Sequence, residues 1–142
     1  METKIKQSLI GGVVATIVMS VFMFLISFIG FPKMNPPAML SGMMGMPVFV
    51  GWFIHLMIGV IFALAYAYFL FNLVKKAGGK VVRGLIFGVA VFIFAQIMFA
   101  LMGAVMGGMP PQEGSMVLLM IASLLGHVVY GIVVAAFVTE KE

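Results

Sequence analysis

Charged side chains are scarce in this sequence. Only 8% of the 142 residues are Asp, Glu, Lys or Arg, whereas 64% are apolar. A soluble domain carries about 25% charged residues, so these charges are too few to cover a surface in water. Lipid must therefore solvate much of the outside. The sequence predicts an integral membrane protein that forms a single domain over residues 1–142.

Cysteine is absent, which excludes disulfides and thiolate metal sites. Charged residues inside the apolar runs are lacking too, because no Asp, Glu, Lys or Arg lies deep in any of them. This argues against a proton-coupled or cation-coupled transporter, and it leaves no acid/base pair for hydrolytic chemistry. We therefore expect a protein that is not an enzyme. The net charge of +4 comes from residues just beyond the apolar runs, so it does not indicate a nucleic-acid partner.

Four apolar runs are long enough to cross a bilayer, which takes about 20 residues. Backbone polar groups in lipid must be satisfied within the segment, so runs of this length are helices. The sequence therefore predicts an all-α fold, an integral membrane four-helix bundle. The predicted spans cover residues 9–31, 48–71, 82–106 and 115–138.

Basic residues predict the orientation of these spans. Lys4 and Lys6 precede the first span. A basic segment, residues 75–83, joins the second and third spans, and Lys141 follows the fourth. By the positive-inside rule, both termini and the central loop face the cytoplasm. We expect a multi-pass protein of the plasma (inner) membrane, whose partners are the lipid bilayer and another membrane protein or a second copy of the chain.

The two halves of the chain align when the sequence is shifted by 72 positions. His55 then falls on His127, and Gly59 falls on Gly131. We predict two duplicated helical hairpins, over about residues 1–72 and 73–142, related by a pseudo-twofold axis along the membrane normal. Small residues recur at every fourth position around both histidines, where they let neighbouring helices approach closely.

Four motifs carry a family resemblance. Gly-x-x-x-His-x-x-x-Gly spans Gly51 to Gly59, and Ser-x-x-x-His-x-x-x-Gly spans Ser123 to Gly131. The runs at residues 12–20 and 31–34 are the other two. With these motifs, nearly the whole chain resembles a family of small, uncharacterised bacterial membrane proteins with four helices. The resemblance implies this fold, and because that family has no assigned activity, it implies no mechanism.

His55 and His127 are the candidate cofactor ligands. A strongly polar side chain inside a membrane is a functional hypothesis by default. Two imidazoles on opposing helices can ligate a haem iron or a soft metal ion. Gly59 and Gly131, one turn along, would leave room for a flat macrocycle such as haem b. The alternative is that each histidine hydrogen-bonds across a helix pair, to Gln96, Ser20, Ser123 or a backbone carbonyl.

Methionine is abundant, with 15 residues, and five of them lie in the first outer loop. Thioethers suit Cu(I), particularly where no thiolate is available. Met43, Met44 and Met46 therefore form a candidate copper site. The alternative is that these flexible, apolar side chains fill irregular gaps in the packing.

Three functions fit these features. The first is a non-catalytic structural or accessory component of a larger membrane complex, which small-residue stripes facing lipid would favour. The second is a redox or haem-binding protein ligated by His55 and His127, which needs both imidazoles in one cavity. The third is a copper-handling protein, or a small carrier for a neutral or soft solute, which needs a polar track through the bundle.

Overall fold

The computed structural model describes residues 2–108 and 114–139, and these residues form helices and no strands. The all-α prediction is confirmed. The described residues contain five helices rather than the predicted four, when the contiguous α3, η2 and α4 are counted as one. They are α1 (Glu2–Ile26), which ends in the 3₁₀ turn η1 (Ser27–Ile29), α2 (Pro36–Met43), α3 (Val48–Ala65), the π-helical turn η2 (Tyr66–Leu70), α4 (Phe71–Val74), α5 (Lys80–Met106) and α6 (Met116–Phe137).

Four helical segments are long and apolar enough to cross a membrane, and each overlaps one of the predicted runs. Three of them have 27 residues and the fourth has 22, so all four reach the ~20 residues that a bilayer requires. Lys141, which contributed to the predicted orientation, lies outside the described residues. The four segments are Thr3–Ile29, Val48–Val74, Lys80–Met106 and Met116–Phe137.

The fifth helix, α2, lies in the first of the two predicted outer loops. Asn35 caps it, because its side-chain oxygen accepts a hydrogen bond from the Ala38 backbone N–H at 3.1 Å, and Pro36 begins the helix. A capping Asn followed by Pro is a typical helix start. The four-helix prediction was wrong here because hydropathy detects only spans, and α2 has eight residues. α2 packs on α3, where the Pro37 carbonyl fills the space beside Gly51.

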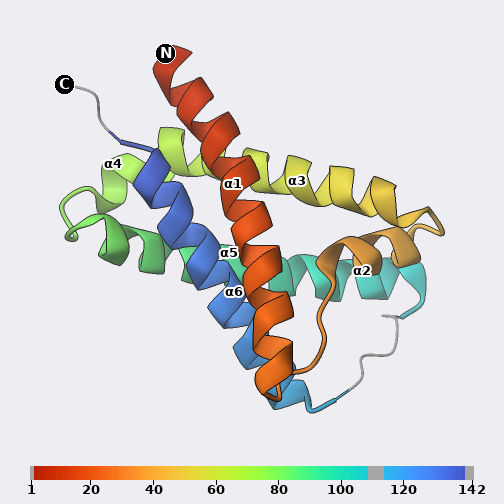
Figure 1. The fold of residues 1–142 in the computed structure, drawn as a ribbon. Helices are drawn as coiled ribbons and strands as arrows, with labels where there is room; N and C mark the ends of the chain where they lie inside the picture. Colours follow the sequence, from red (N-terminus) through yellow and green to blue (C-terminus); the bar gives the residue numbers. More distant parts are fainter. Residues whose placement is uncertain (1, 109–113, 140–142) are drawn as a thin grey trace.

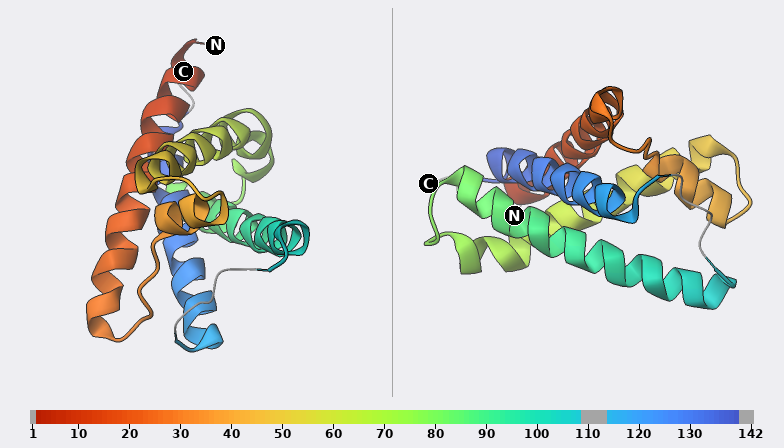
Figure 2. Two further views of the ribbon diagram at one scale, coloured as in Figure 1. Left: turned by 90° about the vertical axis from the view of Figure 1, so that its right-hand side faces the viewer. Right: turned by 90° about the horizontal axis from the view of Figure 1, so that it is seen from below.

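The long helices form two crossed layers (Figures 1 and 2). α1 and α6 lie side by side and run in opposite directions, while α3 packs on α1 and α5 packs on α6. α3 and α5 cross the first pair at a steep angle and, within the described part of the chain, do not pack closely against each other. Helices in a four-helix bundle lie nearly parallel, so the arrangement differs from the predicted bundle.

Glycines bring the two layers into backbone contact. A Cβ on Gly12 would lie 2.7 Å from Cα of Val60, and one on Gly88 would lie 2.5 Å from the His127 carbonyl oxygen. Since backbone atoms cannot move aside as side chains do, these positions need glycine. Gly84 likewise faces the backbone of Ile132, and both residues stand 72 positions after Gly12 and Val60. One offset therefore relates two helix contacts, while the duplication itself stays a prediction.

The chain segments outside the long helices gather at two ends. The side chains of Lys4 and Arg83 both lie over the ring of Phe71. Gln7 donates a hydrogen bond to the Thr139 hydroxyl at 3.3 Å. The start of α1, the α4–α5 connection and the end of α6 thus share one end of the molecule. α2 and the start of α3 lie toward the other end of the crossed layers (Figure 1).

Candidate functional site

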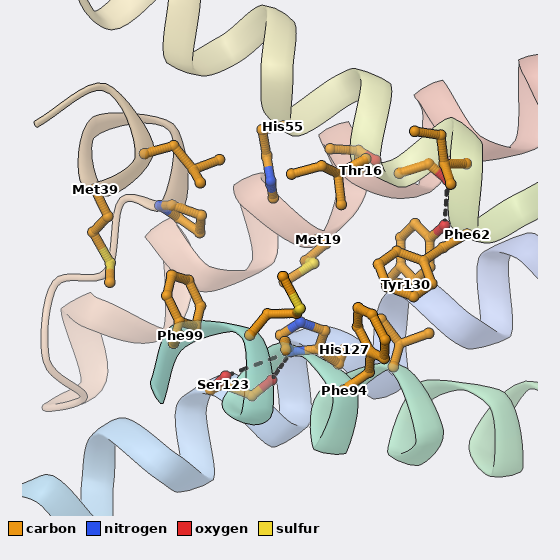
Figure 3. A pocket seen from close by; sticks show the side chains of 18 of the residues that line it. Thr16, Met19, Met39, His55, Phe62, Phe94, Phe99, Ser123, His127 and Tyr130 are labelled. Atoms are coloured by element: carbon orange, nitrogen blue, oxygen red, sulfur yellow. Dashed lines mark hydrogen bonds between the residues drawn. The ribbon is translucent and has the colours of Figure 1, made fainter. Parts of the chain in front are cut away.

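A cavity of about 520 Å³ lies between α3 and α5, over α1 and α6 (Figure 3). Its volume falls in the range of small-molecule sites, about 300–1,000 Å³. Ile61 on α3 and Phe94 on α5 both line the cavity, and they are also 55% and 49% exposed. The cavity therefore reaches the molecular surface where the two outer helices separate.

The wall of the cavity is almost entirely apolar. Thr16 and Tyr130 bring hydroxyls to it, but both hydroxyls are occupied. Thr16 Oγ1 donates to the Gly12 carbonyl at 2.7 Å, and the Tyr130 hydroxyl donates to the Gly59 carbonyl at 2.5 Å. Ser123 and the two histidines are left as the polar groups open to a ligand. Thioethers and aromatic rings cover much of the remaining wall: Met19, Met23, Met34, Met39, Met98, Met102, Phe62, Phe94 and Phe99.

His127 projects into the cavity from α6, one turn after Ser123 (Figure 3). Its Nδ1 lies 2.7 Å from the Ser123 carbonyl oxygen and 3.5 Å from the Ser123 hydroxyl. A carbonyl oxygen only accepts, so Nδ1 carries a proton, and in the neutral ring Nε2 is left as an acceptor or metal ligand. Gln96 on α5 donates to the Ser123 hydroxyl at 3.3 Å. The orientation of the ring is therefore fixed by two helices.

His55 projects into the same space from α3, on the opposite side (Figure 3). Its Nε2 is buried and makes no hydrogen bond within the described part of the chain. A buried polar atom without a partner costs about 1–3 kcal/mol. A ligand that offers this nitrogen a partner would recover that free energy, so His55 is a candidate contact for a ligand in the cavity.

Both histidines thus line one cavity, which the haem-binding hypothesis requires. The alternative hypothesis, hydrogen bonding to protein groups, applies to His127, although the carbonyl that it contacts belongs to its own helix and not to a neighbour. It does not apply to the Nε2 of His55.

Gly59 lines the cavity, and the expectation that Gly59 and Gly131 leave room for a macrocycle stays a prediction. The backbones of Gly84 and Gly88 fill the space beside Gly131, which is not part of the cavity wall. The side chain of Thr16 fills the space beside Gly59. Both glycines serve the close approach of helices within the chain, so their stripes do not face lipid.

Met43, Met44 and Met46 lie apart from the histidines, whereas Met34 and Met39 of the same loop line the cavity. Met44 and Met46 are exposed in the turn between α2 and α3, and neither they nor Met43 line the cavity. The copper site stays a prediction. Within the described part of the chain, no group of three or more His, Cys, Asp or Glu residues is placed to hold a metal ion.

The cavity methionines that lie inside the spans were not identified from the sequence, because a methionine there is not distinguished from any other apolar residue. Their spacing holds a signal. Met19 and Met23 are four residues apart on α1, and Met98 and Met102 are four apart on α5. Residues four apart share a helix face, so each pair presents two thioethers to the same space.

Comparison with known proteins places the chain in a family without adding an activity. No curated protein and no solved structure matches it. A model of the family of unknown function DUF6789 matches residues 2–141. Because that match covers nearly the whole chain, the protein belongs to the family of unknown function DUF6789.

Proposed function

We propose that the protein is a non-catalytic membrane component that binds a small apolar molecule dissolved in the bilayer. The observation that carries this proposal is the cavity between α3 and α5. It has the volume of a ligand site, a wall of thioethers and aromatic rings, and an opening toward the surface where lipid would lie. Apolar pockets with a few convergent polar groups are the usual form of small-molecule sites.

The histidines define the polar part of this ligand. His127 Nε2 accepts a hydrogen bond, because its Nδ1 proton is directed to the Ser123 carbonyl. The Nε2 of His55 supplies a second, unpaired nitrogen. A hydroxyl or phenol head group on an apolar body suits this pair, since it can donate to one imidazole while accepting from the other. The apolar body would then lie against the methionines and phenylalanines.

The apolar helices and the basic end of the molecule indicate how it would lie in the membrane. The four apolar helices are compatible with a membrane protein, and the end that carries Lys4 and Arg83 would face the cytoplasm by the positive-inside rule. The α2 end would then face outward. In this orientation the gap between α3 and α5 opens sideways into the hydrocarbon layer, so a ligand would enter from lipid and not from water.

A second candidate is haem, held by His55 and His127. One observation favours it. Metal-ligating histidines usually donate their other ring N–H to a carbonyl or carboxylate, and His127 does so to Ser123 at 2.7 Å. Haem and the hydroxyl-bearing ligand make different demands on His55, since iron coordination needs its Nε2 deprotonated and a hydrogen bond to a hydroxyl does not.

The test is to identify what copurifies with the protein and to fill the cavity. Ala95 lines the cavity on α5, whereas Ala100 on the same helix does not line it and is exposed. We expect solvent extracts of wild-type protein, analysed by mass spectrometry, to be enriched in one apolar molecule. That molecule should be lost from Ala95→Phe and retained in the matched control Ala100→Phe.

The absorption spectrum decides between the two candidates. A Soret band that disappears in His127→Ala would assign haem. A spectrum without one, together with an enriched hydroxyl-bearing molecule, would assign the first ligand class. Equal extracts from wild type and Ala95→Phe would contradict ligand binding in this cavity altogether.

A further inference from the structure

The end of the molecule opposite α2 carries a second, separate feature. The ring of Phe71, at the start of α4, is 3% exposed and has two cations over it. Lys4 Nζ, on α1, lies 5.9 Å from the ring centroid, and Arg83 Cζ, on α5, lies 5.5 Å from it. Both distances are within the ~6 Å reach of cation–π attraction. One aromatic ring thus gathers two positive charges from helices far apart in sequence.

Among the described side chains, no carboxylate pairs with either of these two charges. The sequence contains no Asp or Glu between residues 3 and 112, and within the described part of the chain neither Lys4 nor Arg83 has an ion pair. The Nε of Arg83 is buried and has no hydrogen-bond partner there. Like charges near one another repel, and the contacts with the Phe71 ring offset part of this repulsion. An anion bound at this end would relieve both the repulsion and the unpaired donor.

We propose that Lys4 and Arg83, organised by Phe71, bind the phosphate group of an anionic phospholipid. A guanidinium and an ammonium are the two side-chain groups that hold phosphate best. Exposed apolar side chains favour a lipid as the source of the phosphate, because Leu73 and Val82, which are close in sequence to Phe71 and Arg83, are 77% and 41% exposed. The acyl chains would cover these side chains while the head group contacts the cations. This site is independent of the cavity between α3 and α5.

The binding experiment uses the full chain in detergent micelles that contain phosphatidylglycerol or phosphatidylcholine with identical acyl chains. Native mass spectrometry counts bound lipids, and the unfolding midpoint reports stabilisation. We expect phosphatidylglycerol to bind and to raise the midpoint more than phosphatidylcholine does. Because each cation near an anionic lipid surface contributes about 1 kcal/mol, Lys4→Gln and Arg83→Gln should each weaken phosphatidylglycerol binding about fivefold.

Lys33→Gln is the matched control, since it removes one charge from the loop before α2, at the opposite end. It should leave phosphatidylglycerol binding unchanged. Equal binding of the two lipids by wild-type protein would overturn the proposal, and so would equal losses in Lys33→Gln and Lys4→Gln. A separate arm adds inorganic phosphate alone. Stabilisation by inorganic phosphate equal to that by phosphatidylglycerol would assign the site to a soluble phosphate and overturn the lipid assignment.

If Arg83→Gln does not fold, Arg83→Lys replaces it. This variant keeps the charge but loses the planar, forked donor geometry, so it should retain binding and lose part of the preference for phosphatidylglycerol. Full retention of the preference in both Arg83→Lys and Lys4→Gln would show that these two side chains do not form the site.

Discussion

The inner helices, α1 and α6, differ sharply from the outer helices, α3 and α5. In the most apolar stretch of each helix, 39% of the residues of α1 and α6 are buried inside the chain, against 17% for α3 and α5. All four helices are similarly apolar, so composition does not distinguish them. Their place in the fold does. The inner pair holds the molecule together, and the outer pair forms the walls of a cavity.

The 72-residue offset would also make two helix pairs equivalent, yet only one of these pairs packs closely. That offset relates α1 to α5 and α3 to α6, so the close contact between α1 and α6 corresponds to the pair α5 and α3. The first pair packs side by side, and the second does not pack closely. If the halves arose by duplication, the cavity lies where the symmetry of the copies is broken.

The largest expected effect is at a backbone contact between the layers. Gly84→Val should lower the free energy of unfolding by more than about 3 kcal/mol, because its side chain would meet the backbone of Ile132, which cannot repack. Gly42→Val is the control, since nothing lies within 4 Å of a Cβ at Gly42. Unfolding in mixed micelles with rising SDS, followed by circular dichroism, measures both. Similar losses in the two variants would contradict the packing role of Gly84.

A smaller effect separates the inner from the outer helices directly. Met23 on α1 is 1% exposed, whereas Leu101 on α5 is 55% exposed. Met23→Ala should lower the free energy of unfolding by about 2–3 kcal/mol, near the low end of the range for buried methionines. The loss is at the low end because the helices unfold within lipid, so the substitution removes packing contacts but no transfer from water. Leu101→Ala should cost less than about 0.5 kcal/mol. The same SDS titration tests this, and comparable losses would remove the distinction between inner and outer helices.

The smallest effect concerns the Tyr130 hydroxyl, which joins α6 to α3 at the cavity. Tyr130→Phe removes the hydrogen bond from α6 to the Gly59 carbonyl on α3 and should cost about 1 kcal/mol. Tyr68→Phe, at a side chain that is 40% exposed, should cost nothing measurable. Infrared detection of the Gly59 carbonyl, labelled with ¹³C, gives an independent readout. An unshifted band in Tyr130→Phe would show that the bond is not made.

The sequence predicted the four spans, and it singled out the two histidines that line the cavity, because both features follow from local physical chemistry. An apolar run of the right length must be helical in lipid, and an imidazole inside it stands out at once. The sequence did not show that α3 and α5 would separate. The stripes around Gly59 and Gly131 indicate that helices touch, but not which helix faces which.

The missed features share a different cause. α2 was missed because hydropathy detects only membrane spans, although Asn35 and Pro36 form a typical helix start. The cavity wall was overlooked because methionines such as Met98 and Met102 are ordinary in a span until the fold brings them to one space. Met43, Met44 and Met46 attracted attention because they cluster in sequence, whereas the cavity methionines cluster in space.

One turn of helix separates the two proposed sites. α3 ends at Ala65, and α6 ends at Phe137, which stands 72 positions later, so the π-helical turn η2 and α4 extend beyond the matched length. In η2 the Phe71 N–H bonds to the Tyr66 carbonyl, five residues back, which inserts one extra residue into the turn. Deleting Ala67 should therefore give an α-helical turn in which the Phe71 N–H still bonds to the Tyr66 carbonyl, now four residues back, so that Phe71 stays beside Lys4 and Arg83 and His55 keeps its position. The π-helical turn thus absorbs one extra residue without turning either end of the helix, and the cavity end and the basic end can be altered separately.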